Sequence, residues 1–156
     1  MINDVELLPE HIMLIDDDPF SLMLSKMKLK KIVEERNIID FYDTEKALDY
    51  LDQHLGKESA MIPDLILLEV MMNDANGWDF IPRYSDLMAK VKSSKIQLVV
   101  LTSSQFFSDY RKASKFEAVK GFMMKPIRND LLLEIYSKAA QGKTYAGNAM
   151  FQSFLV

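Results

Sequence analysis

Four groups of polar residues in this chain could do chemistry, and each directly follows an aliphatic segment. Residues 16–18 are three aspartates, Glu69 ends "DLILLE", Thr102 ends "LVVLT" and Lys125 ends "GFMMK". Clustered carboxylates repel one another unless a cation lies among them, and a partial set of oxygen ligands favours Mg²⁺. A lysine and a hydroxyl directed at one point are what a phosphoryl group requires. If the four groups meet, they predict a site for magnesium and phosphate.

The elements that must position these groups follow a regular pattern. Short aliphatic segments alternate with longer amphipathic ones, as in a parallel sheet built from βα units. The predicted strands are residues 11–16, 37–42, 64–69, 96–102 and 119–124. Five such units predict an α/β fold of the flavodoxin-like (βα)5 type. Its parallel five-stranded sheet would have the order 2-1-3-4-5, with helices on both faces.

The predicted helices have apolar residues at helical spacing. The first begins at Pro19 and carries an apolar stripe, which we expect to face the core. Asp43 or Thr44 caps the second, the third and fourth cover about residues 78–91 and 106–116, and the last runs from an Asn129 cap to Gly142. The stripe of the first helix is Phe20, Met23, Leu24 and Met27; that of the second is Ala47, Leu48, Leu51 and Leu55; that of the last is Leu131, Leu132 and Ile135.

Parallel strands bring their carboxyl ends to one crevice, so the four polar groups should meet there. Glu69 ends the third predicted strand, and we expect its side chain to surface in the crevice and not in the core. Each group has an ordinary structural interpretation when taken alone. Residues 16–18 could cap a helix, residues 102–104 could form a loop, and Lys125-Pro126 could form a turn. Their joint placement at four strand ends is the specific signal.

Four segments carry a resemblance to a known family: HIMLIDDDP, PDLILLEVMMNDANGWDF, VVLTSS and GFMMKP. In this order and spacing the chain resembles a response-regulator receiver domain of two-component signalling, of the chemotaxis-receiver kind, over about residues 10–140. The resemblance implies that Asp16 and Asp17 help to hold Mg²⁺, with Asp17 the direct ligand unless the register shifts to Asp18. Position 69 and the backbone carbonyl of Met71 would be further ligands.

The resemblance also assigns roles around the phosphoryl group. Thr102 would move toward a phosphoryl oxygen, Lys125 would pair with that group, and Phe122 would be the aromatic residue that changes rotamer. Gly77 corresponds to the family's glycine in the loop after the third strand, a position suited to positive φ. Lys125-Pro126 corresponds to the family's cis peptide bond.

Two residues depart from the family pattern. Asn73 replaces a proline and should loosen its loop slightly, whereas Glu69 occupies the position of the phosphoaccepting aspartate. One additional methylene moves the carboxylate outward by roughly 1.3–1.5 Å, and a misplacement of about 1 Å can cost on the order of 100-fold in rate. We therefore expect phosphotransfer to be impaired or absent and Mg²⁺ to bind weakly. Without metal, Lys125 should pair with Glu69.

Two other functions remain open. The chain could be a pseudo-receiver, a phosphorylation-independent binding module in which Glu69 stands in part for the phosphoryl group. More remotely, Asp16 and Asp18 satisfy the Asp-x-Asp motif of haloacid-dehalogenase-like phosphatases. Against that enzyme class, Phe20 lies where a small β-branched residue is expected, and no late acidic metal motif follows Lys125.

Composition narrows the setting in which the chain works. The net charge of −4 is unlike a nucleic-acid-binding surface, and no apolar run approaches the roughly 20 residues that span a membrane. The chain has no cysteine, and its first residues do not form a signal peptide. We expect a cytoplasmic, non-enzymatic receiver domain over residues 1–142, followed by a tail, residues 143–156, with no separate output domain.

The expected partners are proteins. A sensor histidine kinase or a phosphotransfer protein would act on the crevice, and a downstream target would bind the surface of the fourth helix, fifth strand and fifth helix. Aromatic residues lie in or beside that surface, and about half of them should instead pack in the core: Phe106, Phe107, Tyr110 and Phe116. The tail is apolar enough to dock on the domain or on a second chain, which allows a homodimer, through Tyr145, Met150, Phe151, Phe154 and Leu155.

Overall fold

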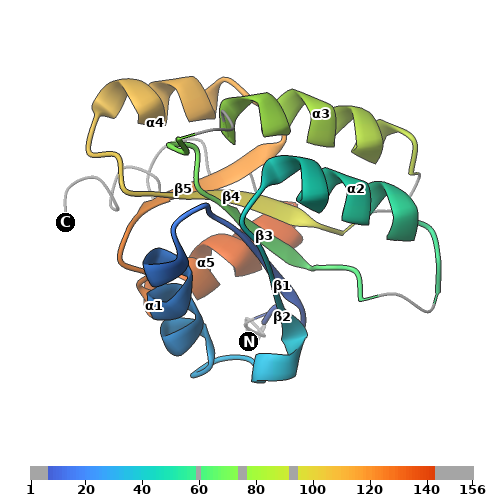
Figure 1. Cartoon of the computed structure of the whole chain (residues 1–156), viewed down its shortest axis with the longest axis horizontal. Helices are drawn as coiled ribbons and strands as arrows, with labels where there is room; N and C mark the ends of the chain where they lie inside the picture. The colour runs from blue at the N-terminus through green and yellow to red at the C-terminus, as the bar shows by residue number, and fades with distance from the viewer. Residues whose placement is uncertain (1–6, 59–60, 74–76, 92–94, 143–156) are drawn as a thin grey trace, which may run out of the picture.

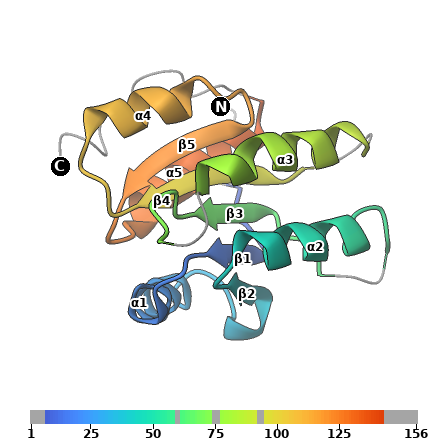
Figure 2. The ribbon, with the colours of Figure 1, turned by 45° about the horizontal axis from the view of Figure 1, so that its top comes forward.

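The sheet has the predicted order. A computed structural model describes residues 7–58, 61–73, 77–91 and 95–142. Its five strands are all parallel, in the order β2-β1-β3-β4-β5 (Figure 2). They are β1 (Ile12–Ile15), β2 (Ile38–Phe41), β3 (Leu65–Leu68), β4 (Gln97–Thr102) and β5 (Val119–Met124). Each strand lies within the range predicted for it, so the flavodoxin-like (βα)5 fold is confirmed.

Helices cover both faces of the sheet, as Figure 1 shows. One face carries α1 (Pro19–Leu29) and α5 (Asn129–Ala140). The other carries α2 (Thr44–His54), α3 (Gly77–Ala89) and α4 (Phe107–Ser114), and a short 3₁₀ helix, Glu35–Asn37, precedes β2. Within the described part of the chain, no helix combines the length and the apolar character needed to cross a membrane.

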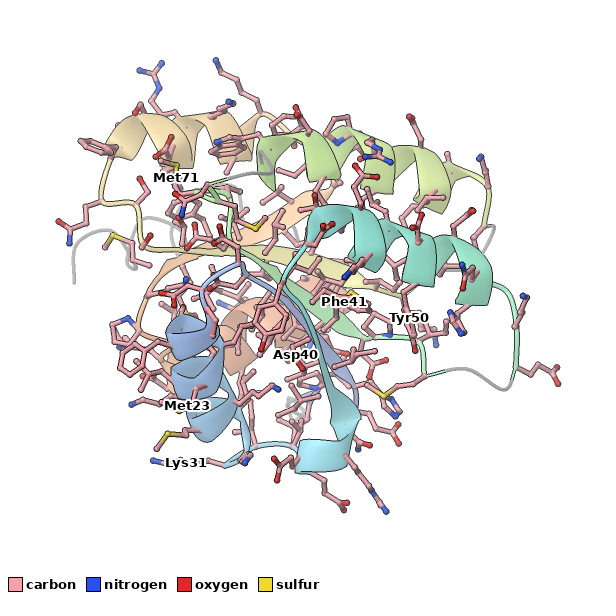
Figure 3. The ribbon with its side chains drawn as sticks, in the orientation of Figure 1. Met23, Lys31, Asp40, Phe41, Tyr50 and Met71 are labelled. Carbon is pink, nitrogen blue, oxygen red and sulfur yellow. The ribbon has the colours of Figure 1, made fainter. Side chains whose placement is uncertain are left out.

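The central strands are apolar throughout because helices cover them on both sides. All four residues of β1 and all four of β3 are buried. Successive side chains of a strand point to opposite faces. Met13 and Ile15 therefore join the core under α2, α3 and α4, whereas Ile12 and Leu14 join the core under α1 and α5. At the edge of the first core, Tyr50 of α2 lies against Phe41 of β2, with ring centroids 5.5 Å apart (Figure 3).

One predicted helix cap is correct and another is wrong. Asp43 caps α2, because its carboxylate accepts hydrogen bonds from the backbone N–H groups of Glu45 and Lys46 at 2.6 and 3.2 Å. Asn129 is instead the first residue of α5, and its N-cap is Arg128, which makes no side-chain capping bond. The Asn129 amide donates to the backbone carbonyl of Lys28 at 2.9 Å. This bond ties the start of α5 to the last turn of α1.

The apolar stripe predicted for α1 does not lie in the core, so that prediction is wrong. Phe20 and Met27 are 63% and 58% exposed, and Met23 and Leu24 are exposed as well. The helix packs on the sheet through Leu22, Ser25 and Leu29. Apolar residues occur all round this helix, so their spacing alone does not single out one face. Its orientation is supported by an ion pair from Lys26 to Asp40 of β2, 2.8 Å long.

Gly77 begins α3 directly against the end of β3. A Cβ atom at this position would lie 2.4 Å from the carbonyl oxygen of Glu69 and 2.5 Å from Cα of Val70. Gly77 does not have positive φ, so that part of the expectation is wrong. Close approach of two backbones, rather than a left-handed conformation, requires glycine here.

Substituting Gly77→Ala should lower the free energy of unfolding by about 1–3 kcal/mol, because backbone atoms must move to make room. The same shift should move the amide NMR signals of Met71 and Ser103, whose N–H groups both bond to the Glu69 side chain. Gly56→Ala is the matched control, because open space surrounds Gly56 and only its positive φ opposes the change. Unchanged Met71 and Ser103 signals in Gly77→Ala would contradict the link between this glycine and the crevice.

Candidate functional site

Four strand ends bring the predicted groups together at one edge of the sheet. Backbone hydrogen bonds continue the ladder past the strands, from Asp16 N–H to Phe41, from Glu69 N–H to Ile15 and from Lys125 N–H to Thr102, at 2.8–3.0 Å. These bonds hold the bases of the functional side chains in register. Met71 follows in the loop beyond β3, where Figure 3 labels it. The structure thus brings Asp16, Glu69, Thr102 and Lys125 into one cluster.

The Glu69 carboxylate is buried and fully hydrogen-bonded. It lies in the crevice with the other strand-end groups, as predicted, but its side chain is only 3% exposed, so the expectation that it reaches the surface is wrong. Oε1 accepts from the Thr102 hydroxyl at 2.6 Å and from the Met71 N–H at 2.8 Å. Oε2 accepts from the Ser103 N–H at 2.9 Å and lies 2.8 Å from the Lys125 ammonium. Four donors on two oxygens compensate for the loss of hydration.

Lys125 lies between two carboxylates. Its Nζ is 2.5 Å from Oδ2 of Asp16 and 2.8 Å from Oε2 of Glu69, and its side chain is 18% exposed. Burial works to lower the pKa of Lys125, but hydrogen bonds and charges from Asp16 and Glu69 outweigh it, and the pKa is raised above the ordinary value. The Lys125–Glu69 pair expected from the sequence is present. The equal share of Asp16 in holding the ammonium was not foreseen.

The three consecutive aspartates have three different roles. Asp16 is buried and accepts from Lys125, from the Ser21 hydroxyl at 2.8 Å and from the Asp18 N–H at 3.0 Å. Asp17 accepts from the Asn73 N–H at 2.9 Å, which joins the loops after β1 and β3. Asp18 caps α1 through the Phe20 N–H. Spacing alone does not separate these roles, because adjacent side chains at a strand end point in different directions.

Thr102 and Phe122 connect the cluster to α4 and to the core. Thr102 is fully buried, and its hydroxyl oxygen also accepts from the Ser104 N–H at 3.1 Å. Phe122 is fully buried, with its ring edge-on to Tyr110 at a centroid distance of 5.8 Å. The Ser103 N–H was missed by the sequence analysis, since a backbone donor leaves no mark on side-chain identity. The Lys125-Pro126 peptide bond is cis, as the resemblance implied.

The implied magnesium ligands do not form a metal site as they are arranged. Among the residues that the structure describes, no three acidic or histidine side chains are grouped as metal ligands. Glu69 is turned toward Thr102 and Lys125, and Asp16 and Asp17 have other hydrogen-bond donors. The positive charge between Asp16 and Glu69 comes from Lys125. The residues present therefore do not fit a magnesium ion without rearrangement.

Comparison with known proteins identifies one family. The model of the response regulator receiver domain matches residues 12–137, well over half of the chain. No curated protein sequence gives a match. The family match does not support the phosphatase alternative.

Solved structures agree with this match. A response regulator receiver protein from Dyadobacter fermentans is 27% identical, covers 85% of this chain and 98% of its own, and has a TM-score of 0.70. A two-component response regulator from Cytophaga hutchinsonii is 22% identical, with 88% and 100% covered and a TM-score of 0.68. The receiver domain of an Arabidopsis thaliana histidine kinase, complexed with Mg²⁺, is 16% identical, with 83% and 94% covered and a TM-score of 0.70. The last two similarities show the fold alone.

Removing the Lys125 charge should destabilise the fold. Lys125→Met leaves Asp16 and Glu69 side by side without a cation. Breaking a fully buried pair costs about 3–5 kcal/mol, and partial exposure of Lys125 reduces this to about 2–3 kcal/mol. Chemical denaturation measures the difference. Lys57→Met is the matched control, because Lys57 is exposed and its side chain has no ion pair within the described residues, so its stability should change by less than about 0.5 kcal/mol.

The Lys125 contribution should also depend on pH. A lysine whose pKa is raised by folding stabilises the protein fully below its ordinary pKa of about 10.4, and this stabilisation is lost as the pH rises through the higher folded value. The stability gap between the parent chain and Lys125→Met should be constant from neutral pH to about pH 10 and narrow above it. A gap that narrows below pH 9 would contradict the pairing.

Proposed function

We propose a function for this chain from one premise: it belongs to the response regulator receiver domain family. Receiver domains are generally signalling modules rather than enzymes, and they interact with histidine kinases and phosphotransfer proteins. The proposed function is that of a receiver domain that transmits a two-component signal by protein–protein interaction. Phosphotransfer to it is impaired or absent, because Glu69 replaces the acceptor aspartate.

A single observation carries the proposal. The Glu69 carboxylate receives a hydroxyl, an ammonium and two backbone N–H groups, from Thr102, Lys125, Met71 and Ser103. A phosphoryl group on a shorter aspartate would require donors of the same kinds, since both groups are anions that need charge-assisted hydrogen bonds. Glu69 thus holds its own negative charge where the resemblance puts the phosphoryl group.

The same contacts oppose phosphorylation of Glu69. A nucleophilic oxygen must approach the phosphorus of the donor, but both oxygens of Glu69 face two hydrogen-bond donors each inside the protein. An attack would require Thr102 or Lys125 to release the carboxylate and Glu69 to move toward solvent. This cost adds to the misplacement caused by the additional methylene.

A continuous set of contacts leads from Glu69 to α4. Thr102 bonds to Glu69, and its oxygen accepts from the Ser104 N–H. The Ser104 hydroxyl in turn bonds to Asp109 in the first turn of α4 and accepts from the Phe106 N–H at 3.2 Å. Phe106 and Phe107 are exposed beside these contacts. We propose that Glu69 holds this start of α4 in one arrangement, and that a downstream protein binds the α4–β5–α5 surface.

A pseudo-receiver is the second candidate. The burial of Glu69 favours this candidate. Both oxygens of the Glu69 carboxylate are already hydrogen-bonded, so these contacts form without any phosphodonor. In that case the chain would bind its target at all times and phosphorylation would play no part.

The bounds of the domain, its cellular location and its partners are also proposals. We propose that the receiver domain comprises residues 1–142, that the chain is cytoplasmic, and that the phosphodonor is a sensor histidine kinase or a phosphotransfer protein. We propose no nucleic-acid or membrane partner. The apolar tail, residues 143–156, lies outside the described residues, and its docking on the domain or on a second chain stays a prediction.

The Glu69→Asp variant tests the proposed function. Shortening the side chain should release Thr102 and free one carboxylate oxygen for attack. Incubation with acetyl phosphate or phosphoramidate, with Mg²⁺ in the buffer, should add one acid-labile phosphoryl group to the variant and little or none to the parent. Intact-mass measurement counts the groups. The matched control is Glu69→Gln, which keeps the longer side chain and should remain unmodified.

The possible outcomes separate the candidates. Labelling of Glu69→Asp alone supports a receiver site with one altered residue. If all three chains fold but none is labelled at any donor concentration, the pseudo-receiver is correct. Rapid labelling of the parent chain on Glu69 would overturn the proposal, because it would show that the longer carboxylate can reach the donor.

A further inference from the structure

Two backbone N–H groups hold the loop after β3 to the acids of the crevice. The Met71 N–H donates to Oε1 of Glu69 at 2.8 Å, and the Asn73 N–H donates to Oδ2 of Asp17 at 2.9 Å. The second bond joins residues that are 56 positions apart in the sequence. One short loop thus donates to two of the carboxylates that the resemblance assigns to a metal ion.

Asp17 differs from the other two acids of the crevice in its surroundings. Asp16 and Glu69 are buried and both bond to Lys125, whereas Asp17 is partly exposed. Within the part of the chain that the structure describes, no cationic side chain pairs with Asp17. A cation that enters from solvent would therefore meet Asp17 first. The Asn73 N–H is the group that competes with such an ion for this carboxylate.

The donor at Asn73 belongs to the backbone, so it depends on one property of the residue. Proline alone among the residues has no backbone N–H. Asn73 lies where the resemblance places a proline, and only a looser loop was expected from this difference. The structure shows a further effect, because the N–H group joins the loops after β1 and β3. Asn73 itself is exposed, so a change of its side chain should leave the fold intact.

We propose that the Asn73 N–H is a latch that closes the crevice against divalent cations. Mg²⁺ requires ligands in near-ideal octahedral positions, whereas the latch holds the Asp17 carboxylate where the loop after β3 places it. An ion could use both Asp17 and Glu69 only after the latch opens and Glu69 turns away from its four donors. Asn73 is a positioning residue that acts through Asp17. This inference goes beyond the proposed function, since it concerns the affinity of the crevice for metal and involves no phosphodonor.

Mg²⁺ titration of the full chain, followed by the amide NMR signals of Asp17 and Ser103, tests the proposal. Asn73→Pro removes the N–H group and should bind Mg²⁺ about threefold to tenfold more tightly than the parent, the range expected for one hydrogen bond to a partly exposed charge. Asn73→Ala is the matched control. It removes the same side chain but keeps the N–H group, so its affinity should equal that of the parent.

A double-mutant cycle tests whether the effect passes through Asp17. In an Asp17→Ala background the latch has no acceptor, so the addition of Asn73→Pro should leave the remaining Mg²⁺ affinity unchanged. The proposal is overturned if Asn73→Pro and Asn73→Ala bind Mg²⁺ alike. It is also overturned if the proline strengthens binding equally with and without Asp17, since the effect would then come from the shape of the loop.

Hydrogen exchange in the parent chain provides a test that needs no change at residue 73. The Asn73 N–H should exchange more slowly in the parent than in Asp17→Ala, and Mg²⁺ should speed its exchange in the parent as the bond breaks. Equal exchange in the parent and in Asp17→Ala overturns the proposal even if the proline variant does not fold. All of these measurements omit a phosphodonor, so the inference and the proposed function fail separately.

Discussion

The Lys125 ammonium between the Asp16 and Glu69 carboxylates is the interaction on which the rest of the site depends. Two buried carboxylates that bond to the same ammonium repel each other when that ammonium is absent. Each also loses hydration free energy on burial, which only a charged partner can offset. Lys125 offsets this by bonding to both, at 2.5 and 2.8 Å. Its raised pKa is the consequence, because the two acids stabilise the charged form beyond the cost of its burial. The positive charge that balances Asp16 and Glu69 is thus the side chain of Lys125.

The parallel sheet makes this interaction possible. Asp16, Glu69 and Lys125 come from the ends of β1, β3 and β5, and the parallel sheet brings those ends to one edge. Gly77 lets α3 begin directly against the Glu69 backbone. Thr102, from β4 between β3 and β5, completes the set of donors. The Glu69 carboxylate reaches the Thr102 hydroxyl and the Lys125 ammonium itself, and these donors compensate for its burial.

Sequence reasoning predicted the parts that depend on periodicity and on strand ends. The five strands, their order and the meeting of Glu69, Thr102 and Lys125 all follow from aliphatic segments of strand length and from the rule for parallel sheets. Sequence reasoning failed for features that depend on how a helix is oriented on the sheet. The α1 stripe was expected in the core, but apolar residues surround that helix, and the pairing of Lys26 with Asp40 helps to turn it the other way.

Local geometry accounts for the other differences. Glu69 was expected at the surface, because the sequence shows a carboxylate at a strand end but not the Met71 and Ser103 N–H groups that satisfy it when buried. Asn129 was expected to cap α5, but its amide bonds to α1 across the domain, a contact between segments far apart in sequence. Both errors concern hydrogen bonds that only the folded chain reveals.

A crystal structure of the unaltered chain grown at neutral pH in excess Mg²⁺ tests the central claim most directly. The account predicts that Glu69 remains turned inward, that Thr102 and Ser103 still donate to it, and that Lys125 remains between it and Asp16 at about 2.7–2.9 Å from each. The contradicting result is an octahedral ion at about 2.0–2.1 Å from Asp17, Glu69 and the Met71 carbonyl, with Thr102 released and Lys125 displaced. In that case the metal, and not Lys125, would balance the acids of the crevice.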